Sequence, residues 1–386
     1  MTSSRKWDVA VLGAGPAGCA TALALKRKGV DRVCVVDPGR HRGSPVGETL
    51  PPDVRWVLEE LGLWSGFVGE AHEACLGSCS SWGSDALGYN DFVLSPLGKG
   101  WHLDRQRFDS FLLDNMVSCG ATLISGARFV DCERDRQDGF RLRLRARDDA
   151  ESLITARFVV DATGSRSAFA RRAGARRNYL DSLTFVYGFF DNSAGRSVSR
   201  LTMLEAVEAG WWYAAGVPGQ RVAVAFATDA DVVRRDMLFR EERWLARVLR
   251  TRHIAPRLDG CGFLGNSLAI RAAPSFLLDP VAGAGWLAVG DAAATYDPLS
   301  SQGIHNALED GIAAANTIAA AIASDTKAPG GYPQALAARF KEYQANRNYF
   351  YDLETRWPGS AFWERRRERT QLRTPNVMSG MATEQA

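Results

Sequence analysis

Residues 13–18 read Gly-Ala-Gly-Pro-Ala-Gly, a G-x-G-x-x-G pattern, and the elements on either side of it predict the fold. The short apolar run Trp7–Leu12 precedes it, and helical spacing follows as far as Lys28. A second apolar run, Val33–Asp37, ends in an acid. The order predicts a β-α-β unit whose turn glycines bring backbone N–H groups close to a pyrophosphate, with Asp37 on a ribose hydroxyl.

The rest of the chain shows two kinds of secondary-structure pattern. Buried strands are expected at Phe158–Asp161 and Trp286–Asp291, a half-exposed strand at Arg141–Arg147, and helices at Asp53–Leu63, Phe108–Ser118 and Ile304–Ser324. Between them, residues 182–271 predict an inserted layer: antiparallel strands at Phe185–Phe190, Arg200–Leu204, Trp211–Val217 and Val222–Thr228, then a helix over Asp229–Thr251. The segment Gln334–Arg369 is expected to be helical and charged.

Composition excludes several classes of protein. The 386 residues carry 47 basic and 44 acidic side chains, a net charge of +3 that does not suit a dedicated nucleic-acid binder. No stretch approaches the roughly 18 apolar residues of a membrane-spanning helix, and no signal peptide is expected. The seven Cys are odd in number and scattered, so we expect reduced thiols, a cytoplasmic protein and no metal site.

Four further motifs follow in order along the chain. Arg105-x-x-Phe108-Asp109 opens a helix, and Asp161-Ala162-Thr163-Gly164 ends a strand. Gly290-Asp291 ends another strand, and Asp297-Pro-Leu-Ser-Ser-Gln-Gly-Ile304 leads into a helix. With the glycine turn, these motifs resemble the FAD-dependent monooxygenase superfamily, the group of para-hydroxybenzoate hydroxylase and the tryptophan halogenases.

The resemblance implies an α/β fold. A glutathione-reductase-like FAD-binding Rossmann domain would comprise residues 1–181 and 272–330, an inserted antiparallel-sheet substrate domain 182–271, and a helical C-terminal segment 331–386. Asp291 would hold the ribityl chain of FAD, and the backbone of residues 302–304 would run along the flavin ring. The expected FAD-binding residues are Gly13, Gly15, Pro16, Ala17, Gly18, Asp37, Pro38, Arg40, Glu48, Thr49, Leu50, Arg105, Phe129, Ala162, Thr163, Gly164, Gly290, Asp291, Pro298, Gln302, Gly303 and Ile304.

A finer likeness lies in a loop and several aromatic motifs. Gly47-Glu-Thr-Leu-Pro-Pro52 is similar to the G-E-x-x-P loop of halogenases and their relatives. Together with Gly100–Arg105, Gly210–Tyr213, Arg356–Pro358 and Phe362-Trp363, it looks most like the flavoprotein maturases that hydroxylate protein Trp residues in tryptophylquinone biogenesis. Five of the eleven Trp residues lie in these motifs, which we take as pointers to the substrate groove.

Three departures argue against halogenation. Residues 66–91, where halogenases place a Lys, contain none, and Lys99 is the nearest. Residues 211–218 keep only the outline of the W-x-W-x-I-P signature of halogenases, and Ser300 stands where tryptophan halogenases carry a Glu. The favoured activity is therefore hydroxylation of an indole ring, with the Trp presented by a peptide or protein.

The resemblance implies that O₂ is the cosubstrate and that a flavin C4a-hydroperoxide oxidises the ring. NAD(P)H would reduce FAD directly, or a separate flavin reductase would supply reduced flavin. The candidates for proton relay are Glu48, His102, Asp297 and His305. A halogenase, an FAD-dependent reductase or dehydrogenase, and a flavin-bound peptide-binding protein without chemistry stay open as alternatives.

Two features have more than one interpretation. The aromatic side chains of Trp211–Tyr213 either wall a substrate pocket or fill a core between sheets. The run Arg365–Arg367 is interpreted as a solvated helix face, with docking of an acidic peptide as the alternative.

Overall fold

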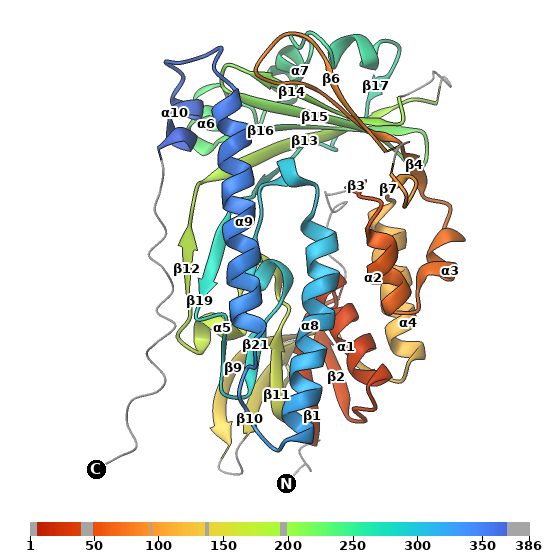
Figure 1. Cartoon of the computed structure of the whole chain (residues 1–386), viewed down its shortest axis with the longest axis vertical. Helices are drawn as coiled ribbons and strands as arrows, with labels where there is room; N and C mark the ends of the chain where they lie inside the picture. Colours follow the sequence, from red (N-terminus) through yellow and green to blue (C-terminus); the bar gives the residue numbers. More distant parts are fainter. Residues whose placement is uncertain (1–5, 40–48, 93–94, 136–138, 194–198, 369–386) are drawn as a thin grey trace.

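The computed structural model describes residues 6–39, 49–92, 95–135, 139–193 and 199–368. Helices and sheets are mixed in two tiers, which confirms the predicted α/β class. In Figure 1 one sheet lies at the bottom beside α1 (Pro16–Arg27), and a second sheet lies across the top. The long helix α9 (Tyr332–Leu353) runs between the two tiers.

The lower sheet carries the predicted β-α-β unit. Within the described residues its strands are β1 (Lys6–Leu12), β2 (Val33–Asp37), β8 (Thr122–Ser125), β9 (Ala127–Asp135), β10 (Gly139–Ala146), β11 (Glu151–Asp161), β20 (Ala282–Gly283) and β21 (Trp286–Ala288). The order β20-β21-β11-β1-β2-β8 places β1 between its two parallel neighbours, β2 and β11. The glycine turn after β1 therefore lies where the strand order reverses, the usual ligand position in such sheets.

The upper sheet contains the inserted strands and two more. Its strands are β5 (Gly77–Ser81), β6 (Gly88–Asp91), β13 (Leu183–Asp191), β14 (Leu201–Val207), β15 (Gly210–Val217), β16 (Arg221–Asp229), β17 (Gly262–Phe263) and β18 (Ala269–Ala272). β5 pairs in parallel with β14, so residues 77–91 extend the sheet whose other strands follow residue 182. The domain boundaries stay a prediction. The predicted inserted domain, residues 182–271, did not include the hairpin of residues 77–91.

Two small sheets and the remaining helices complete the described chain. The short strands are β3 (Thr49–Leu50), β4 (Glu73–Cys75), β7 (Gly100–His102), β12 (Arg176–Tyr179), β19 (Phe276–Asp279) and β22 (Ala294–Thr295). The remaining helices are α2 (Val54–Glu60), α3 (Trp64–Val68), α4 (Arg105–Ser118), α5 (Ala168–Arg172), α6 (Ala230–Arg235), α7 (Glu241–Val248), α8 (Gly303–Ala323) and α10 (Ala361–Arg367). The single helix predicted over Asp229–Thr251 is wrong: the chain turns between α6 and α7, where Met237 has a φ of 52°.

Helices α1 and α8 pack directly against each other. A Cβ on Gly311 of α8 would lie 2.6 Å from the Cβ of Ala20 and 2.8 Å from the carbonyl oxygen of Ala17, so the glycine permits this close approach. The contact brings the N-terminus of α8 toward the glycine turn that precedes α1 (Figure 1).

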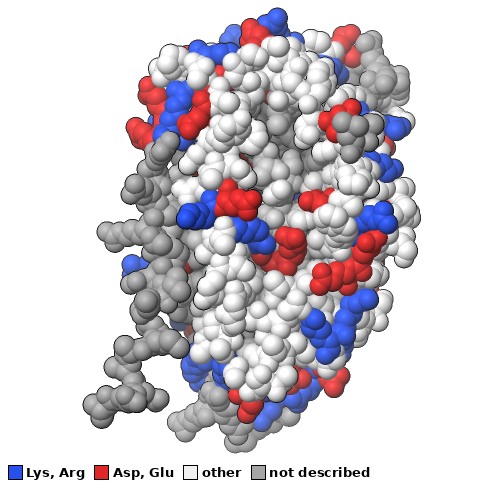
Figure 2. All heavy atoms as spheres, viewed as in Figure 1, with Lys and Arg blue, Asp and Glu red and all other residues white. Residues whose placement is uncertain are grey.

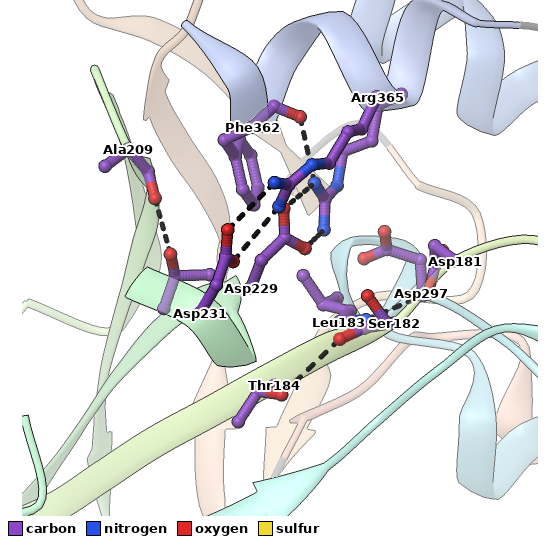
Figure 3. Close-up of polar contacts among 12 residues, drawn as sticks. Asp181, Ser182, Leu183, Thr184, Ala209, Asp229, Asp231, Asp297, Phe362 and Arg365 are labelled. Carbon is purple, nitrogen blue, oxygen red and sulfur yellow. Dashed lines mark hydrogen bonds and ion pairs between the residues drawn. The ribbon is translucent and has the colours of Figure 1, made fainter. Parts of the chain in front are cut away.

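The C-terminal helix α10 is clamped to the upper sheet by arginines. Arg366 is buried and donates to both carboxylate oxygens of Asp229, at 2.8 and 3.2 Å. Arg365 bridges Asp229 and Asp231, which face it in Figure 3. Arg367 donates to the backbone carbonyl of Glu354. The interpretation of Arg365–Arg367 as a solvated face is therefore wrong for Arg366, which is buried, whereas Arg365 is exposed but paired with Asp229 and Asp231.

The surface in Figure 2 carries a band of acidic and basic side chains across the middle of the molecule, and above the band the centre of this face is largely uncharged, with charged side chains at the upper left and along the top edge. The ion pairs of Arg339 on α9 with Glu309 and Asp310 on α8 join these two helices. No helix in the described ranges is both long enough and apolar enough to cross a membrane.

Candidate flavin and substrate site

One cavity of about 830 Å³ is lined by residues of both tiers. Its lower part is formed by the N-termini of α1 and α8 and by residues that follow β11 and β21. Its upper part is formed by β13, β15, β16 and β18 of the upper sheet. The predicted cofactor motifs and the predicted substrate layer therefore share a single space.

The glycine turn has the geometry that a phosphate cradle requires. Gly13 has a φ of 111°, and a Cβ there would lie 2.2 Å from the carbonyl oxygen of Ala162. Gly15 lines the cavity, and a Cβ there would meet no other protein atom within 4 Å, so the missing side chain leaves room for a ligand. The first turn of α1 carries no acidic residue, and the partial positive charge of its N-terminus therefore favours an anion.

Asp37 lies beside this turn at the end of β2. Its Oδ2 accepts from the backbone N–H of Ala14 at 2.9 Å, and its Oδ1 accepts from Gly39 at 2.7 Å. These bonds fix the carboxylate next to the phosphate cradle. Two carboxylate oxygens offer more lone pairs than these two bonds use, so Asp37 retains acceptor capacity for a ribose hydroxyl.

Asp291 lies inside the cavity with Arg105 of α4. The Asp291 side chain is exposed, and it lines the cavity, so the space that it faces is the interior of the cavity. Desolvation raises the pKa of Asp291 to about 6, while Arg105 lowers it and the nearby carboxylate of Asp310 raises it. A carboxylate and a guanidinium in one polar pocket suit the hydroxyl-bearing ribityl chain of a flavin.

The N-terminus of α8 forms the next part of the wall. Pro298, Gly303 and Ile304 line the cavity, and a Cβ on Gly303 would meet no other protein atom within 4 Å. The first turn of α8 also carries no acidic residue, so a second positive helix end faces this space. This arrangement fits FAD. The cavity has two helix N-termini that favour anions, two glycine positions without a protein neighbour, and the polar side chains of Asp291 and Arg105.

The predicted cofactor residues divide by position. Those that line the cavity are Gly15, Pro16, Ala17, Thr49, Arg105, Ala162, Gly164, Asp291, Pro298, Gly303 and Ile304. Those that do not line it are Gly13, Gly18, Asp37, Pro38, Leu50, Phe129, Thr163, Gly290 and Gln302. Phe129 packs against Phe169, with ring centroids 5.6 Å apart. Arg40 and Glu48 lie outside the described residues.

Aromatic side chains of the upper sheet form the opposite wall. Phe185 and Tyr187 of β13, with Trp211 and Tyr213 of β15, line the cavity. Trp212 points to the other face of the sheet, where it stacks on Phe226 at 4.5 Å between ring centroids. Since side chains alternate along a strand, residues 211–213 both wall the pocket and fill the core.

The other Trp residues of the predicted aromatic motifs lie away from the cavity. Trp101 packs edge-on against Phe67, with ring centroids 5.3 Å apart. Trp357 and Trp363 stack on each other, with ring centroids 6.1 Å apart, in the cluster that packs on the same face of the upper sheet as Trp211, but neither lines the cavity. Of the five Trp residues taken as pointers to the substrate groove, Trp211 alone lines the cavity of the described structure.

A chain of hydroxyl groups runs from the cavity to His102. Tyr213 Oη lies 3.0 Å from Thr49 Oγ1, which lies 3.4 Å from Thr202 Oγ1, and Thr202 Oγ1 lies 3.0 Å from His102 Nε2. Burial lowers the pKa of His102 to about 4, with an opposing effect from a hydrogen bond to the backbone of Gly216. His102 is therefore neutral at physiological pH and orients this chain through its ring nitrogens.

Asp297 lines the cavity, but its carboxylate points into the protein. It accepts from Tyr351 Oη at 2.7 Å and from the backbone N–H of Leu299 at 3.0 Å, with Arg347 Nε at 3.7 Å. Burial raises the pKa of Asp297, and the charge of Arg347 opposes that shift. The same Tyr351 hydroxyl accepts from Trp211 Nε1 at 3.1 Å, so Asp297 is linked to the aromatic wall.

His305 does not line the cavity. Its Nε2 lies 3.7 Å from Asp53 Oδ1, and its Nδ1 lies 3.7 Å from Glu309 Oε2. The structure therefore brings Asp297 and the hydroxyl chain of His102 to the cavity but leaves His305 between two carboxylates outside it.

Sequence reasoning missed three features of the site. Thr202 connects His102 to the cavity, and no local pattern marks it. Ala225 and Arg271 line the upper part of the cavity. The repeats Phe185-x-Tyr187 and Trp211-x-Tyr213 were a signal that could have located the wall, because alternate residues of a strand share a face.

Comparison with known proteins agrees with this geometry. LodB of Marinomonas mediterranea, assigned as an FAD-dependent oxidoreductase, is 29% identical over 364 residues, which cover 93% of this chain and 96% of LodB. The myxobacterial chondrochloren halogenase CndH superposes with a TM-score of 0.85 at 23% identity, over 95% of this chain and 87% of CndH. The peptidyl tryptophan dihydroxylase QhpG superposes with a TM-score of 0.74 at 24% identity, over 94% of this chain and 78% of QhpG.

The two structural likenesses show a shared fold. The resemblance to the FAD-dependent monooxygenase and halogenase superfamily is confirmed, as are the FAD cofactor and an FAD-dependent oxidoreductase as the class of enzyme. Residues 6–330 match the family described as the FAD binding domain, and the chain belongs to that family.

Proposed function

We propose that this protein is an FAD-dependent monooxygenase that hydroxylates an aromatic ring, the indole of a Trp residue presented by a peptide or protein. One observation carries the proposal: a single cavity is lined by the FAD motifs on one side and by aromatic side chains of the upper sheet on the other. An aromatic substrate held against that wall would face the cofactor directly.

FAD would be held by the elements described above. The turn at residues 13–18 and the N-terminus of α1 would bind its pyrophosphate, Asp37 a ribose hydroxyl, and Asp291 with Arg105 the ribityl chain. When bound and reduced by NAD(P)H or by a separate flavin reductase, FAD supplies the activation of O₂. The backbone of residues 302–304 at the start of α8 would lie along the ring system.

The chain's own residues exclude water, orient the ring and move a proton. Phe185 and Trp211 shield the upper part of the cavity with apolar surface. A ring carbon that gains an oxygen atom must lose its hydrogen as a proton. Tyr213 and Thr49 line the cavity and their hydroxyls are hydrogen-bonded to each other, so these hydroxyls would accept and pass that proton, while His102 positions the chain.

Two observations support a Trp within a larger molecule. Arg166 and Arg271 line the cavity and are exposed, so the cavity reaches the surface of the protein. QhpG, whose fold covers nearly the whole of this chain, acts on peptidyl tryptophan. A cavity open to the surface admits a side chain while the rest of its peptide stays outside.

Halogenation is the second candidate, because CndH shares the fold. Among the described residues that line the cavity there is no Lys. Lys99, the nearest to the expected halogenase position, lies over the ring of Trp101, with Nζ 4.3 Å from the ring centroid. The lack of a Lys in the described lining of the cavity therefore favours hydroxylation over halogenation.

The experiment combines FAD-loaded protein, a flavin reductase, NADH, O₂ and a Trp-containing peptide, with chloride and bromide present. Mass spectrometry should show a peptide that gains oxygen, and the added atom should carry the label when isotopic O₂ is used. A chlorinated or brominated peptide would replace the proposal with halogenation. An unchanged peptide, or turnover without O₂, would contradict it.

A pair of variants tests the role of Tyr213. Tyr213→Phe removes only the hydroxyl that is bonded to Thr49, and hydroxylated product should fall about tenfold or more because proton transfer is impaired. Tyr296→Phe is the control: Tyr296 also lines the cavity, but its hydroxyl accepts from Arg339. Equal losses in the two variants would contradict the assigned role.

A further inference from the structure

The floor of the upper cavity is built in rows across three strands. Tyr187 of β13 is paired with Ala225 of β16, and Ala225 is paired with Tyr213 of β15. Paired residues of neighbouring antiparallel strands point to the same face, so two tyrosines flank one alanine. All three residues line the cavity. The small side chain between two rings leaves a slot in the floor.

The next row closes one end of this slot. Phe185 and Trp211 flank Ala227 in the same way, but their rings meet edge to face, with centroids 5.4 Å apart. Ala227 does not line the cavity, which agrees with a closed row. The open slot is therefore limited to the row of Ala225, with the Phe185–Trp211 pair as its end wall.

The width of the slot suits one planar ring. The strands that carry Tyr187 and Tyr213 are separated by two strand spacings, about 9.5 Å. A ring stacked between two others needs about 7 Å between the outer planes, since aromatic atoms in contact lie about 3.5 Å apart. A larger side chain at position 225 would occupy that space.

A guanidinium lies beside the end wall. Arg271 of β18 is paired with Phe185, and so it points to the same face of the sheet. It lines the cavity and is exposed, and within the described residues it forms no ion pair with a carboxylate. Two strand spacings and one step of two residues separate the Cα atoms of Ala225 and Arg271, about 12 Å. The arginine side chain spans part of that distance. A bound molecule could therefore place an aromatic ring over Ala225 and an anionic group at Arg271 if a linker of a few bonds joined the two groups.

We propose that the slot over Ala225 holds the aromatic ring of the substrate between Tyr187 and Tyr213, and that Arg271 binds a carboxylate of the same molecule. The proposal rests on the proposed function and deepens it, because it identifies the substrate as an aromatic ring with a negative charge nearby. In a peptide, that charge is a terminal carboxylate or an acidic residue adjacent to the Trp. Guanidinium and carboxylate form the stronger, charge-assisted class of hydrogen bond.

Two probes that differ by one charge test the anion site. N-acetyltryptophan and N-acetyltryptophanamide carry the same indole, but only the first carries a carboxylate. Binding to the FAD-loaded, oxidised protein is followed by the change in flavin absorbance, so no turnover is needed. We expect the acid to bind about tenfold more tightly than the amide, and Arg271→Gln to abolish that preference.

Arg166→Gln is the matched control, because Arg166 is also exposed and also lines the cavity but belongs to the lower tier. It should keep the preference for the acid. Equal affinity of the wild-type protein for the two probes, or a preference that survives Arg271→Gln, would refute the role of Arg271.

Ala225→Leu and Ala225→Val test the slot itself. The leucine variant should weaken binding of both probes at least tenfold and the smaller valine variant should weaken it less, with FAD content and melting temperature recorded for each. Unchanged binding by a folded, FAD-loaded leucine variant would overturn the slot, as would the absence of any binding to the wild-type protein. Binding as expected with no hydroxylated product would instead count against the proposed function alone.

Discussion

Replacement of Asp291 by Asn should stabilise the FAD-free protein and weaken its hold on FAD. The carboxylate is enclosed in the cavity, and desolvation raises its pKa from 3.8 to about 6. At 1.36 kcal/mol per pKa unit, this difference corresponds to an upper limit of about 3 kcal/mol of destabilisation when the group is ionised. Water in the cavity screens the charge, so we expect about 1–2 kcal/mol.

The pH dependence of this effect on stability follows from the direction in which the pKa of Asp291 is shifted. Folding raises the pKa of this acid. Below its ordinary pKa the acid is protonated in both the folded and the unfolded protein, and it then does not oppose folding. The penalty develops as the pH rises and is complete above about pH 6. Asp291→Asn should therefore gain its full stability advantage at neutral pH and lose it progressively on acidification.

Urea unfolding of the FAD-free proteins between about pH 4.5 and 7.5 measures this difference. FAD titration of the same variant should show an affinity about ten to a hundred times lower, because a hydrogen bond to a charged group is lost. Asp114→Asn, on the exposed surface of α4, is the control and should change neither quantity. An Asp291→Asn variant that is no more stable than wild type at neutral pH would refute the enclosure of this carboxylate.

Three further predictions concern the turn, the clamp and the hydroxyl chain. Gly13→Ala should unfold readily and lose FAD, because its Cβ would collide with the Ala162 carbonyl, whereas Gly15→Ala should melt normally and lose only FAD affinity; thermal melts with FAD titration separate the two. Arg366→Met should lower the free energy of unfolding by about 3 kcal/mol, and the exposed Arg365→Met by at most about 1 kcal/mol, as measured in urea. Thr202→Val should leave FAD binding intact and slow product formation about tenfold, because it interrupts the chain to His102.

Each of these predictions has a contrary outcome. Normal FAD binding by Gly13→Ala would mean that the turn tolerates a side chain. Equal destabilisation by the two arginine variants would mean that the burial of Arg366 does not determine how much its ion pair with Asp229 contributes to the free energy of unfolding. Full activity of Thr202→Val would remove His102 from any part in the reaction.

The lower tier was predictable because its signals are local. Val9–Leu12, the glycine turn and Val33–Asp37 are adjacent in sequence, and each follows a regular pattern that the structure repeats. The hairpin of β5 and β6 was not predictable in the same way. Gly77–Ser81 is made of small residues without alternation, and its partner, β14, lies more than a hundred residues away. Such a pairing is decided by tertiary contacts.

The site was predictable where backbone geometry determines function. Gly13 must adopt a positive φ, and that requirement is visible as a glycine in the sequence. Arg271 and Thr202 owe their positions to strand register, which places them at the cavity through partners elsewhere in the chain. The run Arg365–Arg367 is a case in which the local pattern misleads. A run of charged residues normally predicts a solvent-exposed surface, but Arg366 pairs with the buried carboxylate of Asp229.

The hydrogen bonds behind Asp297 come from α9, which begins after the last residue of the family match. Tyr351 and Arg347 contact its carboxylate, and Tyr343 Oη accepts from its backbone N–H at 2.7 Å. A chain that ended at residue 330 would keep every FAD motif yet leave a buried aspartate stripped of its neutralising partners. Residues of α9 therefore belong to the same structural unit as the FAD motifs, although the family match ends before that helix begins, and removal of α9 should alter the surroundings of Asp297 without altering the glycine turn.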